Sequence, residues 1–315
     1  MKDRFGRTVD YLRLSVTDLC NHRCVYCMPA EGVEKKAHAS ICSLEELEEM
    51  AAAAVALGIR KIRLTGGEPL VRRGIVELTG RLARLEGLEE LTMTTNGSLL
   101  PEYAAPLKAA GLDRLNVSLN SLDPDRFREI TRTGSLDRVL AGLEAAEAAG
   151  FTGTRVNAVL LGGVNVEEIP ALAGLARDRA VSVRFIELMP LGIASALPRE
   201  RFVSGEAVLR ALPELREVGR SGVARLYSAP GWRGTVGLIS PMSCAFCGNC
   251  SRIRITADGK LKPCLHSGAE LPLRGLHGEA LLSALREGIL AKPARHFLAE
   301  AGHSEARRAM HEIGG

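Results

Sequence analysis

Short strand-like segments alternate with helical ones from about residue 10 to about residue 190 of this 315-residue chain. The spacing is close to the roughly 30-residue period of βαβ units, so it predicts parallel strands joined by helices. We expect six strands, at 11–17, 59–65, 90–95, 114–120, 154–160 and 181–189. Six βα units are two short of a complete barrel, which favours an open, partial (βα)6 barrel of the TIM type with active groups at the carboxyl ends of the strands. A flat, doubly wound sheet is the alternative, since periodicity alone does not separate the two.

The pattern changes after Pro190, where strand-like runs at 225–227, 235–239 and 252–256 replace the helices. Asp258-Gly259 marks a hairpin turn within this part. We therefore expect a barrel domain at 1–191 and a smaller, β-rich domain at 192–315. The final segment, 304–315, has a helical pattern and ends in two glycines.

Polar and apolar residues alternate along four of the predicted strands. The alternation places the polar set on one face of each strand and the apolar set on the other. Strands of a parallel sheet are normally apolar on both faces, so a repeated polar face indicates a polar lumen inside the barrel. The cations on that face would converge on one anion, as phosphate recognition requires; they are Arg13, Lys61, Arg63 and Arg155.

Composition narrows the class of protein. Apolar residues make up 46% and charged residues 25%, which is ordinary for a globular protein. The formal charge of +4 is dispersed and aromatic residues are only 4%, so the chain lacks the stacking platform of single-strand nucleic-acid binders. No secretion signal or bilayer-spanning stretch is visible, and we expect a cytoplasmic protein, a monomer or homodimer, whose eight cysteines stay reduced.

Three cysteines lie in one loop after the first strand, Cys20, Cys24 and Cys27. A structural zinc site needs four ligands, and an ordinary electron-transfer cluster uses four cysteines. Three thiolates would hold three irons of a cubane cluster and leave the fourth iron open to a small molecule. Gly66 and Gly67 follow the second strand, where backbone groups could approach a ligand closely.

A second cysteine group lies in the C-terminal part, with Cys244, Cys247 and Cys250 followed by Cys264. Four thiols could close a zinc site or a ferredoxin-like cluster, whereas three would again leave an iron open. The spacing of these cysteines does not distinguish a closed four-thiol site from an open three-thiol cluster. Arg252 and Arg254 share one face of the strand between these cysteines, which suits a triphosphate or, alternatively, a charged edge strand.

The first cysteine loop, with Tyr26 before its last cysteine, and the Gly66-Gly67 turn resemble the radical S-adenosylmethionine (SAM) superfamily. Within that superfamily the chain resembles the GTP 3′,8-cyclase family of molybdenum-cofactor biosynthesis along nearly its whole length. The segments that carry this resemblance are the two cysteine groups, 62–70, 94–97, 185–190, 246–254 and the closing Gly-Gly.

The resemblance implies a role for individual residues. Cys20, Cys24 and Cys27 would hold one [4Fe–4S] cluster, and Cys247, Cys250 and Cys264 a second one whose open iron meets guanine. The residues implied to contact SAM are Tyr26, Gly67, Ser118 and Met189. Those implied to contact GTP are Arg13, Lys61, Arg63, Thr94, Arg155, Arg252, Ile253 and Arg254. The implied catalytic residues are Arg252, Arg254, Gly314 and Gly315, the glycines belonging to a tail that reaches the active site.

Three positions depart from the family's pattern. Cys244 stands where a residue without a thiol is usual, so a fourth ligand to the second cluster stays open. Arg155 stands where Lys is commoner, and Asn120 where Asp is expected. Cys42 is expected to be a small core residue.

The implied activity is a lyase reaction that converts GTP to (8S)-3′,8-cyclo-7,8-dihydroguanosine 5′-triphosphate, the first step of molybdenum-cofactor biosynthesis. It would need an external one-electron donor of the flavodoxin or ferredoxin kind and would pass its product to a cyclic pyranopterin monophosphate synthase. One alternative is another radical SAM enzyme with a cysteine-rich C-terminal domain. The other is a zinc- or cluster-binding module without catalysis.

Overall fold

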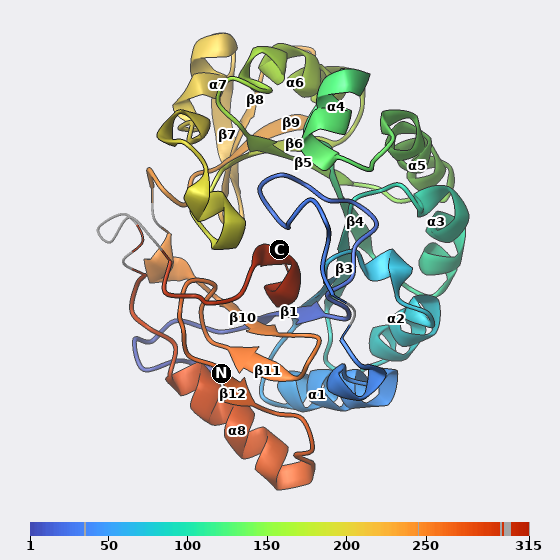
Figure 1. The fold of residues 1–315 in the computed structure, drawn as a ribbon, viewed down its shortest axis with the longest axis vertical. Coiled ribbons are helices and arrows are strands. Elements are labelled where there is room, and N and C mark those ends of the chain that lie inside the picture. Colours follow the sequence, from blue (N-terminus) through green and yellow to red (C-terminus); the bar gives the residue numbers. More distant parts are fainter. Residues whose placement is uncertain (35, 245, 297, 299–303, 315) are drawn as a thin grey trace.

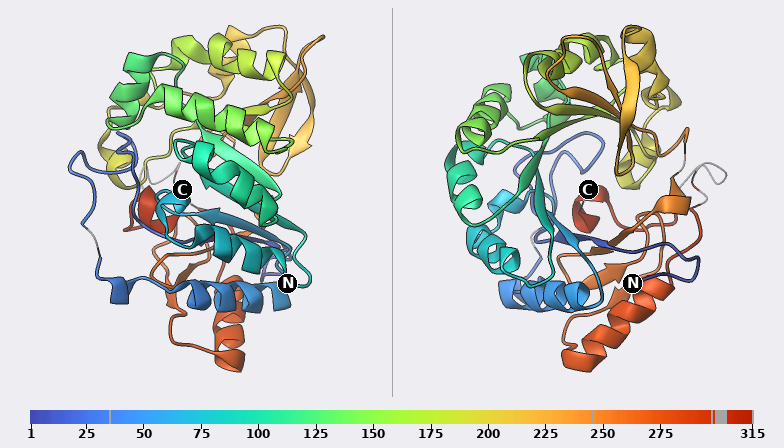
Figure 2. Two further views of the ribbon diagram at one scale, coloured as in Figure 1. Left: turned by 90° about the vertical axis from the view of Figure 1, so that its right-hand side faces the viewer. Right: turned by 180° about the vertical axis from the view of Figure 1, so that it is seen from behind.

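The computed structural model describes residues 1–34, 36–244, 246–296, 298 and 304–314, and it shows one strongly curved sheet (Figure 1). The twelve strands follow the order β12-β11-β10-β1-β2-β3-β4-β5-β6-β9-β8-β7. Helices cover the outer, convex face, and the C-terminal segment lies inside the curve (Figures 1 and 2). A doubly wound sheet would carry helices on both faces, so the partial barrel is confirmed.

The six predicted strands form the middle of the sheet and pair in parallel with their neighbours in chain order. They are β1 (Tyr11–Ser15), β2 (Lys61–Thr65), β3 (Glu90–Thr95), β4 (Arg114–Ser118), β5 (Arg155–Leu160) and β6 (Ser182–Glu187). The helices between and after them are α1 (Leu44–Ala56), α2 (Ile75–Ala83), α3 (Leu100–Ala109), α4 (Pro124–Thr131), α5 (Leu136–Ala148) and α6 (Ile169–Asp178). Ser43 and Glu46 form a capping box that begins α1, because each side chain bonds the other residue's backbone N–H.

The C-terminal part adds strands to both edges of the same sheet. At one edge β9 (Thr235–Ile239) pairs in parallel with β6 and is followed outward by β8 (Ala224–Ser228) and β7 (Arg216–Ser221). At the other edge β10 (Arg252–Ile255) pairs in parallel with β1, and β11 (Lys260–Lys262) and β12 (Leu271–Pro272) follow. The hairpin at Asp258-Gly259 is confirmed, whereas the division of the chain at residue 191 stays a prediction.

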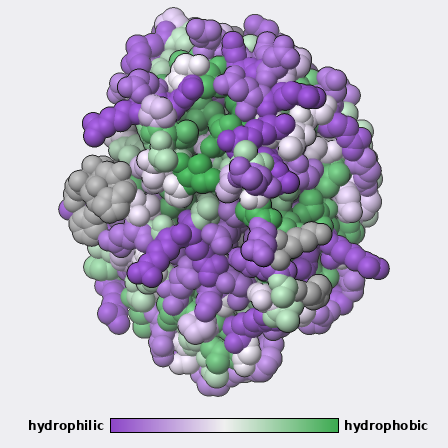
Figure 3. Space-filling view, viewed as in Figure 1, coloured by the Kyte–Doolittle hydropathy of each residue, from purple (hydrophilic) through white to green (hydrophobic). Residues whose placement is uncertain are grey.

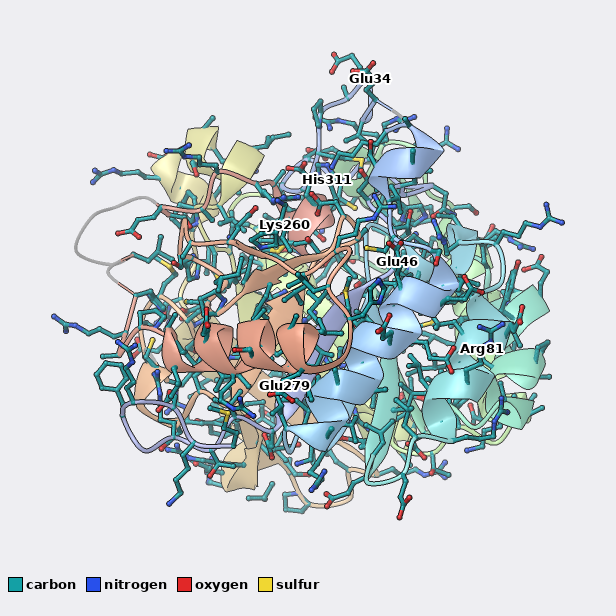
Figure 4. All side chains as sticks on the ribbon, turned by 90° about the horizontal axis from the view of Figure 1, so that it is seen from below. Glu34, Glu46, Arg81, Lys260, Glu279 and His311 are labelled. Atoms are coloured by element: carbon teal, nitrogen blue, oxygen red, sulfur yellow. The ribbon has the colours of Figure 1, made fainter. Side chains whose placement is uncertain are left out.

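Sequence patterns missed four elements of this part, which are β7, β12, α7 (Glu206–Ala211) and α8 (Gly278–Leu290). Helix α8 packs beside α1 (Figure 4). The last helix, α10 (Met310–Ile313), lies within the predicted helical tail. Short 3₁₀ helices occupy His38–Ser40, Pro69–Val71, Val166–Glu168, Gly192–Ala196, Arg199–Arg201 and Cys247–Asn249.

The alternation along the strands separates a core from a lumen. Leu12, Leu14, Ile62 and Leu64 are fully buried against the helices, and Cys42 belongs to the same core as predicted.

On the face visible in Figure 3, hydrophilic residues dominate the lower half and hydrophobic ones gather above the centre. Among the described residues no helix combines the length and the apolar character needed to cross a lipid bilayer.

Just before α10, ion pairs of Arg308 hold the tail against the β10–β11 hairpin and against the segment that precedes β12. The Arg308 guanidinium bonds both carboxylate oxygens of Asp258, at 3.0 and 2.9 Å, and both of Glu270, at 2.7 and 2.8 Å. Glu270 also lies 3.4 Å from the buried Lys262 ammonium. Such two-pronged pairs fix geometry as well as charge.

Replacing Arg308 by Gln is expected to lower the free energy of unfolding by about 2 kcal/mol, since hydrogen bonds to charged groups contribute that much. Burial acts to raise the pKa of Asp258, but Arg308 holds it below its ordinary value, and the pKa of Glu270 is lowered in the same way. Stability from a lowered carboxyl pKa is present above the unfolded value and is lost as pH falls through the folded one. Arg308→Gln should therefore lose less stability than the parent between about pH 7 and about pH 3.

Anaerobic urea unfolding at those two pH values checks both the loss of stability and its smaller dependence on pH. Arg307→Gln is the matched control, because Arg307 is the exposed neighbour in the same segment. Equal effects of the two substitutions would contradict the role given to Arg308.

Candidate functional site

A cavity of about 1010 Å³ lies inside the curve of the sheet. Both cysteine groups line it, as do the polar faces of β1, β2, β4 and β5. The polar lumen inferred from the alternation is therefore present. Of the predicted site residues, the cavity is lined by Arg13, Cys20, Cys24, Tyr26, Cys27, Lys61, Arg63, Gly67, Thr94, Ser118, Arg155, Met189, Cys247, Cys250, Arg252, Arg254 and Cys264.

The first cysteine loop follows β1 and is fixed by backbone contacts. Cys27 N–H donates to the Cys24 carbonyl at 2.9 Å, and Val25 N–H donates to the Ile130 carbonyl at the end of α4 at 2.9 Å. Burial raises the pKa of Cys20 to about 12 and that of Cys24 to about 11. Thiolates in such surroundings need a positive partner, which the iron of a cluster would provide, so the three thiols fit the implied group.

The second cysteine group lies on the segments before β10 and after β11, at the amino ends of the parallel strands, whereas the first cysteine loop follows the carboxyl end of the neighbouring strand β1. Burial acts to raise the pKa of Cys250, but the nearby cations Lys292 and Arg252 lower it to about 7. Cys244 is exposed and does not line the cavity, unlike Cys247, Cys250 and Cys264. In the described part of the chain, no three His, Cys, Asp or Glu side chains converge on a point that suits a single metal ion.

Arginines stand side by side across neighbouring strands of the lumen. Arg13 on β1 is in register with Arg254 on β10 and with Arg63 on β2. Burial lowers the pKa of Arg13, and Arg254 and Arg63 lower it further by repulsion. Burial and neighbouring arginines also lower the pKa of Arg155 and of Arg254, each to about 10. Buried like charges of this kind favour binding of a polyanion that compensates them.

Several buried polar atoms beside these arginines have no hydrogen-bond partner among the described residues. They are the Tyr11 hydroxyl, Thr94 Oγ1, Asn157 Oδ1 and Arg184 Nε, and all four residues line the cavity. Buried polar groups are normally paired, so such a cluster indicates a site that a polar ligand completes.

Two of the residues implied to contact SAM, Tyr26 and Gly67, are held in place at the first cysteine loop. The Tyr26 hydroxyl accepts a hydrogen bond of 2.9 Å from Asn120 Nδ2, and Asn120 Oδ1 accepts one of 2.9 Å from Val159 N–H. Asn120 therefore holds Tyr26 through a donor that an Asp at this position would lack. Gly67 lies against the Leu19 and Asp18 carbonyls, where any Cβ would collide, so this turn requires glycine.

The tail lies between the two cysteine groups. Arg254 donates to the Ile313 carbonyl at 3.2 Å and also to the Gly314 carbonyl. His311 Nδ1 lies 3.3 Å from the Cys27 carbonyl, which joins the tail to the first cysteine loop (Figure 4). Gly314 has φ +73° and packs against Thr65, whereas Gly315 lies outside the described residues.

Two predicted GTP residues are placed differently from the rest. Ile253 does not line the cavity, because it alternates with Arg252 and Arg254 and is buried in the core on the other face of β10. Lys61 lies at the rim, where its ammonium is 3.9 Å from the Asp10 carboxylate.

Other cavity residues were missed by sequence reasoning. Arg184 on β6 is buried, and burial with repulsion from other arginines lowers its pKa to about 9. The alternation of polar and apolar residues continues on β6, and it is the sequence signal that marks Arg184. Arg7, Lys292, His266 and His296 also line the cavity, but they come from loops and a helix end, where no periodic signal exists.

Comparison with known proteins places the chain in a family. Residues 14–176 match the family model described as the Radical SAM superfamily, and residues 181–298 match Molybdenum Cofactor Synthesis C. A protein of Alkaliphilus oremlandii named GTP 3′,8-cyclase is 48% identical over 320 residues, covering 100% of both chains. A protein of Peptoclostridium acidaminophilum with the same name is 50% identical over 319 residues, covering 99% of this chain and 98% of its own.

The fold has relatives among solved structures. The crystal structure of Streptococcus suis SuiB bound to the precursor peptide SuiA has a TM-score of 0.61 at 17% identity and covers 91% of this chain and 67% of that one. This likeness concerns the fold alone. With the family models and the full-length relatives, the chain belongs to the radical SAM superfamily and, within it, to the family of the proteins named GTP 3′,8-cyclase.

Proposed function

We propose that this protein is a lyase that converts GTP to (8S)-3′,8-cyclo-7,8-dihydroguanosine 5′-triphosphate with SAM and two [4Fe–4S] clusters. In this reaction hydrogen leaves ribose C3′, C3′ becomes bonded to guanine C8, and one electron and one proton complete the product. The observation that supports it best is that two groups of three thiols face one cavity lined with arginines. Full-length relatives carry the name of this activity.

The first cysteine group would hold the cluster that cleaves SAM. Cys20, Cys24 and Cys27 are its ligands in this proposal, and a cluster bound there would supply the electron that releases the 5′-deoxyadenosyl radical from SAM. Tyr26, Gly67, Ser118 and Met189 would bind the SAM molecule. All four line the cavity, and the rigid Gly67 turn brings backbone groups close to the first cysteine loop.

The arginines of the lumen would bind the triphosphate of GTP. Arg13, Arg63 and Arg155 repel one another in a buried site, and a polyphosphate would relieve that repulsion. Arg184 and Thr94, each with an unpaired buried atom, join them in the proposal, with Lys61 at the rim. Guanine would then face the second cluster, held by Cys247, Cys250 and Cys264.

Arg252, Arg254 and the tail would complete the chamber between the two clusters. Arg254 already holds the Ile313 and Gly314 carbonyls, so it can fix the tail against the site. In this proposal Gly314 and Gly315 border the reacting nucleotide, and Ile253 contributes through the backbone between the two arginines. Holding ribose near the adenosyl carbon and excluding water are the protein's main contributions to the rate.

Partners and location are part of the same proposal. A flavodoxin- or ferredoxin-like protein would supply single electrons, and a cyclic pyranopterin monophosphate synthase would take up the product. The cytoplasm suits unprotected thiol-held clusters, because its reducing conditions keep cysteines free.

The direct experiment is anaerobic turnover of the reconstituted protein with GTP, SAM and a chemical reductant, followed by identification of both products by mass spectrometry. We expect 5′-deoxyadenosine and the cyclised nucleotide in equal amounts. Deoxyadenosine without any cyclised nucleotide would favour another radical SAM activity, and zinc in place of iron would favour a binding module.

Replacing Cys24 by Ala is expected to reduce SAM cleavage by more than about 100-fold, because the first cluster loses one of its three ligands and even residues around metal ligands change activity by about 10- to 100-fold. Cys244→Ala is the matched control, since Cys244 is exposed and lies outside the cavity. It should keep parental iron content and deoxyadenosine formation. Loss of iron from the control would instead make Cys244 a fourth ligand.

Replacing Arg252 or Arg254 by Ala should reduce the cyclised product about 100-fold, since positioning of substrate contributes that much or more to the rate. SAM cleavage uncoupled from GTP should persist, because its ligands lie in the other cysteine group. Arg216→Ala, on the exposed strand β7, serves as the control. Normal product from both lumen variants would remove these arginines from the nucleotide site.

A further inference from the structure

The loops that carry the second cysteine group are joined by two cations from outside those loops. Arg7 comes from the N-terminal segment before β1, and Lys292 follows α8. Both side chains are almost fully buried, with exposed fractions of 9% and 3% for the two residues, and both line the cavity. Neither belongs to the periodic polar face of a strand.

Arg7 uses its guanidinium to connect three segments. Its Nη1 donates to the Cys247 carbonyl and to the Ala294 carbonyl, each at 2.8 Å, and its Nη2 donates to the Pro293 carbonyl at 2.7 Å. The Asp3 carboxylate, 2.6 Å from Arg7 Nε, orients the group. A planar guanidinium with a fixed fork of donors is suited to hold several carbonyls in one arrangement.

Lys292 contacts the backbone close to the other two cysteines of this group, Cys250 and Cys264. Its ammonium donates to the Arg252 carbonyl at 2.9 Å and to the Pro263 carbonyl at 3.0 Å. Arg252 lies two residues after Cys250, and Pro263 immediately precedes Cys264. Arg7 and Lys292 together therefore contact the backbone at or beside all three predicted ligands.

The charge of Lys292 needs a partner that the described protein groups do not provide. Its hydrogen bonds go to neutral carbonyls, and no carboxylate among the described residues forms an ion pair with it. A buried ammonium is costly unless it is compensated by an opposite charge. Lys292 interacts electrostatically with the Cys250 thiol, and three thiolates on a cluster would carry a net negative charge.

We propose that Arg7 and Lys292 are positioning residues for the second cluster: they hold the three ligand loops in place, and Lys292 compensates the negative charge of the bound cluster. This inference rests on the proposed function, since it requires a cluster at Cys247, Cys250 and Cys264. It adds that a buried cation contacts the loops of this cluster, and that the N-terminal segment is part of its support.

A cation beside an iron–sulfur cluster favours the reduced form, because reduction adds a negative charge. Removing the charge of Lys292 should therefore shift the reduction potential of the second cluster to a more negative value. It should also weaken retention of iron, since groups that surround metal ligands change affinity by about 10- to 100-fold.

The test uses Cys24→Ala as the parent, so that iron bound after anaerobic reconstitution reports the second cluster alone. Lys292→Gln keeps two N–H donors for the carbonyls but removes the charge, and Lys292→Arg keeps the charge. Arg7→Ala removes the contacts, and Arg7→Lys restores the charge with fewer donors. Arg4→Ala, an exposed arginine of the same N-terminal turn, is the matched control.

The readouts are iron per chain, the rate of iron loss to a chelator, the potential from a redox titration followed by electron paramagnetic resonance, and circular dichroism to verify folding. The parent and Arg4→Ala should bind about four irons. Lys292→Gln should lose iron about tenfold faster and have a more negative potential, while Lys292→Arg stays near the parent. Arg7→Ala should retain fewer than about one iron, and Arg7→Lys an intermediate amount.

Each contrary result has its own meaning. If the Cys24→Ala parent holds no iron, the second cluster, and with it the proposed function, is wrong. If the parent holds its iron and folded Lys292→Gln and Arg7→Ala behave like it, the proposed function stands and this inference is wrong. If Lys292→Arg loses iron as fast as Lys292→Gln, charge compensation is wrong.

Discussion

Repulsion between buried arginines is the constraint on which the rest of this molecule depends. The parallel register of β10, β1 and β2 places Arg254, Arg13 and Arg63 next to one another on the concave face. A sheet that only had to fold would carry apolar residues there, as most parallel sheets do. The apolar side of the same strands, packed under the helices of the convex face, must supply the stability that opposes this repulsion. The fold is thus arranged to gather positive charge on its concave face.

The strands were predictable because their residues obey a simple period. Leu12 and Leu14 alternate with Arg13 and Ser15, and the structure places the two sets on opposite faces as the period requires. The capping box at Ser43 and Glu46 was also readable, since it depends on two residues three positions apart. Strand β7 was not, because it is exposed and charged and takes its conformation from pairing with β8. The sequence also did not predict that the N-terminal and C-terminal strands form one sheet, since this depends on pairing between segments far apart in the chain.

The site could be predicted in part for similar reasons. Cysteine spacing marked the residues that would hold iron, and the strand period marked the arginines of four strands. Arg184 follows the same period on the sixth strand, so the strand pattern was sufficient to mark it as well. Arg7 and Lys292 carry no such mark, because their role arises from hydrogen bonds to carbonyls of loops far away in the sequence. Ile253 differs from its neighbours Arg252 and Arg254, because its side chain is buried in the core on the other face of β10, and its predicted contact with GTP stays a prediction.

Pairing of β10 with β1 and of β9 with β6 also determines when the protein can finish folding. During synthesis the first six strands emerge well before their outer neighbours, so β1 and β6 remain as unpaired edges for that interval. Such edges invite association between nascent chains, and contacts that are remote in sequence form slowly. The chamber between the cysteine groups cannot exist before this late step, so a cluster bound at the second cysteine group would be inserted at the end of folding rather than at its start.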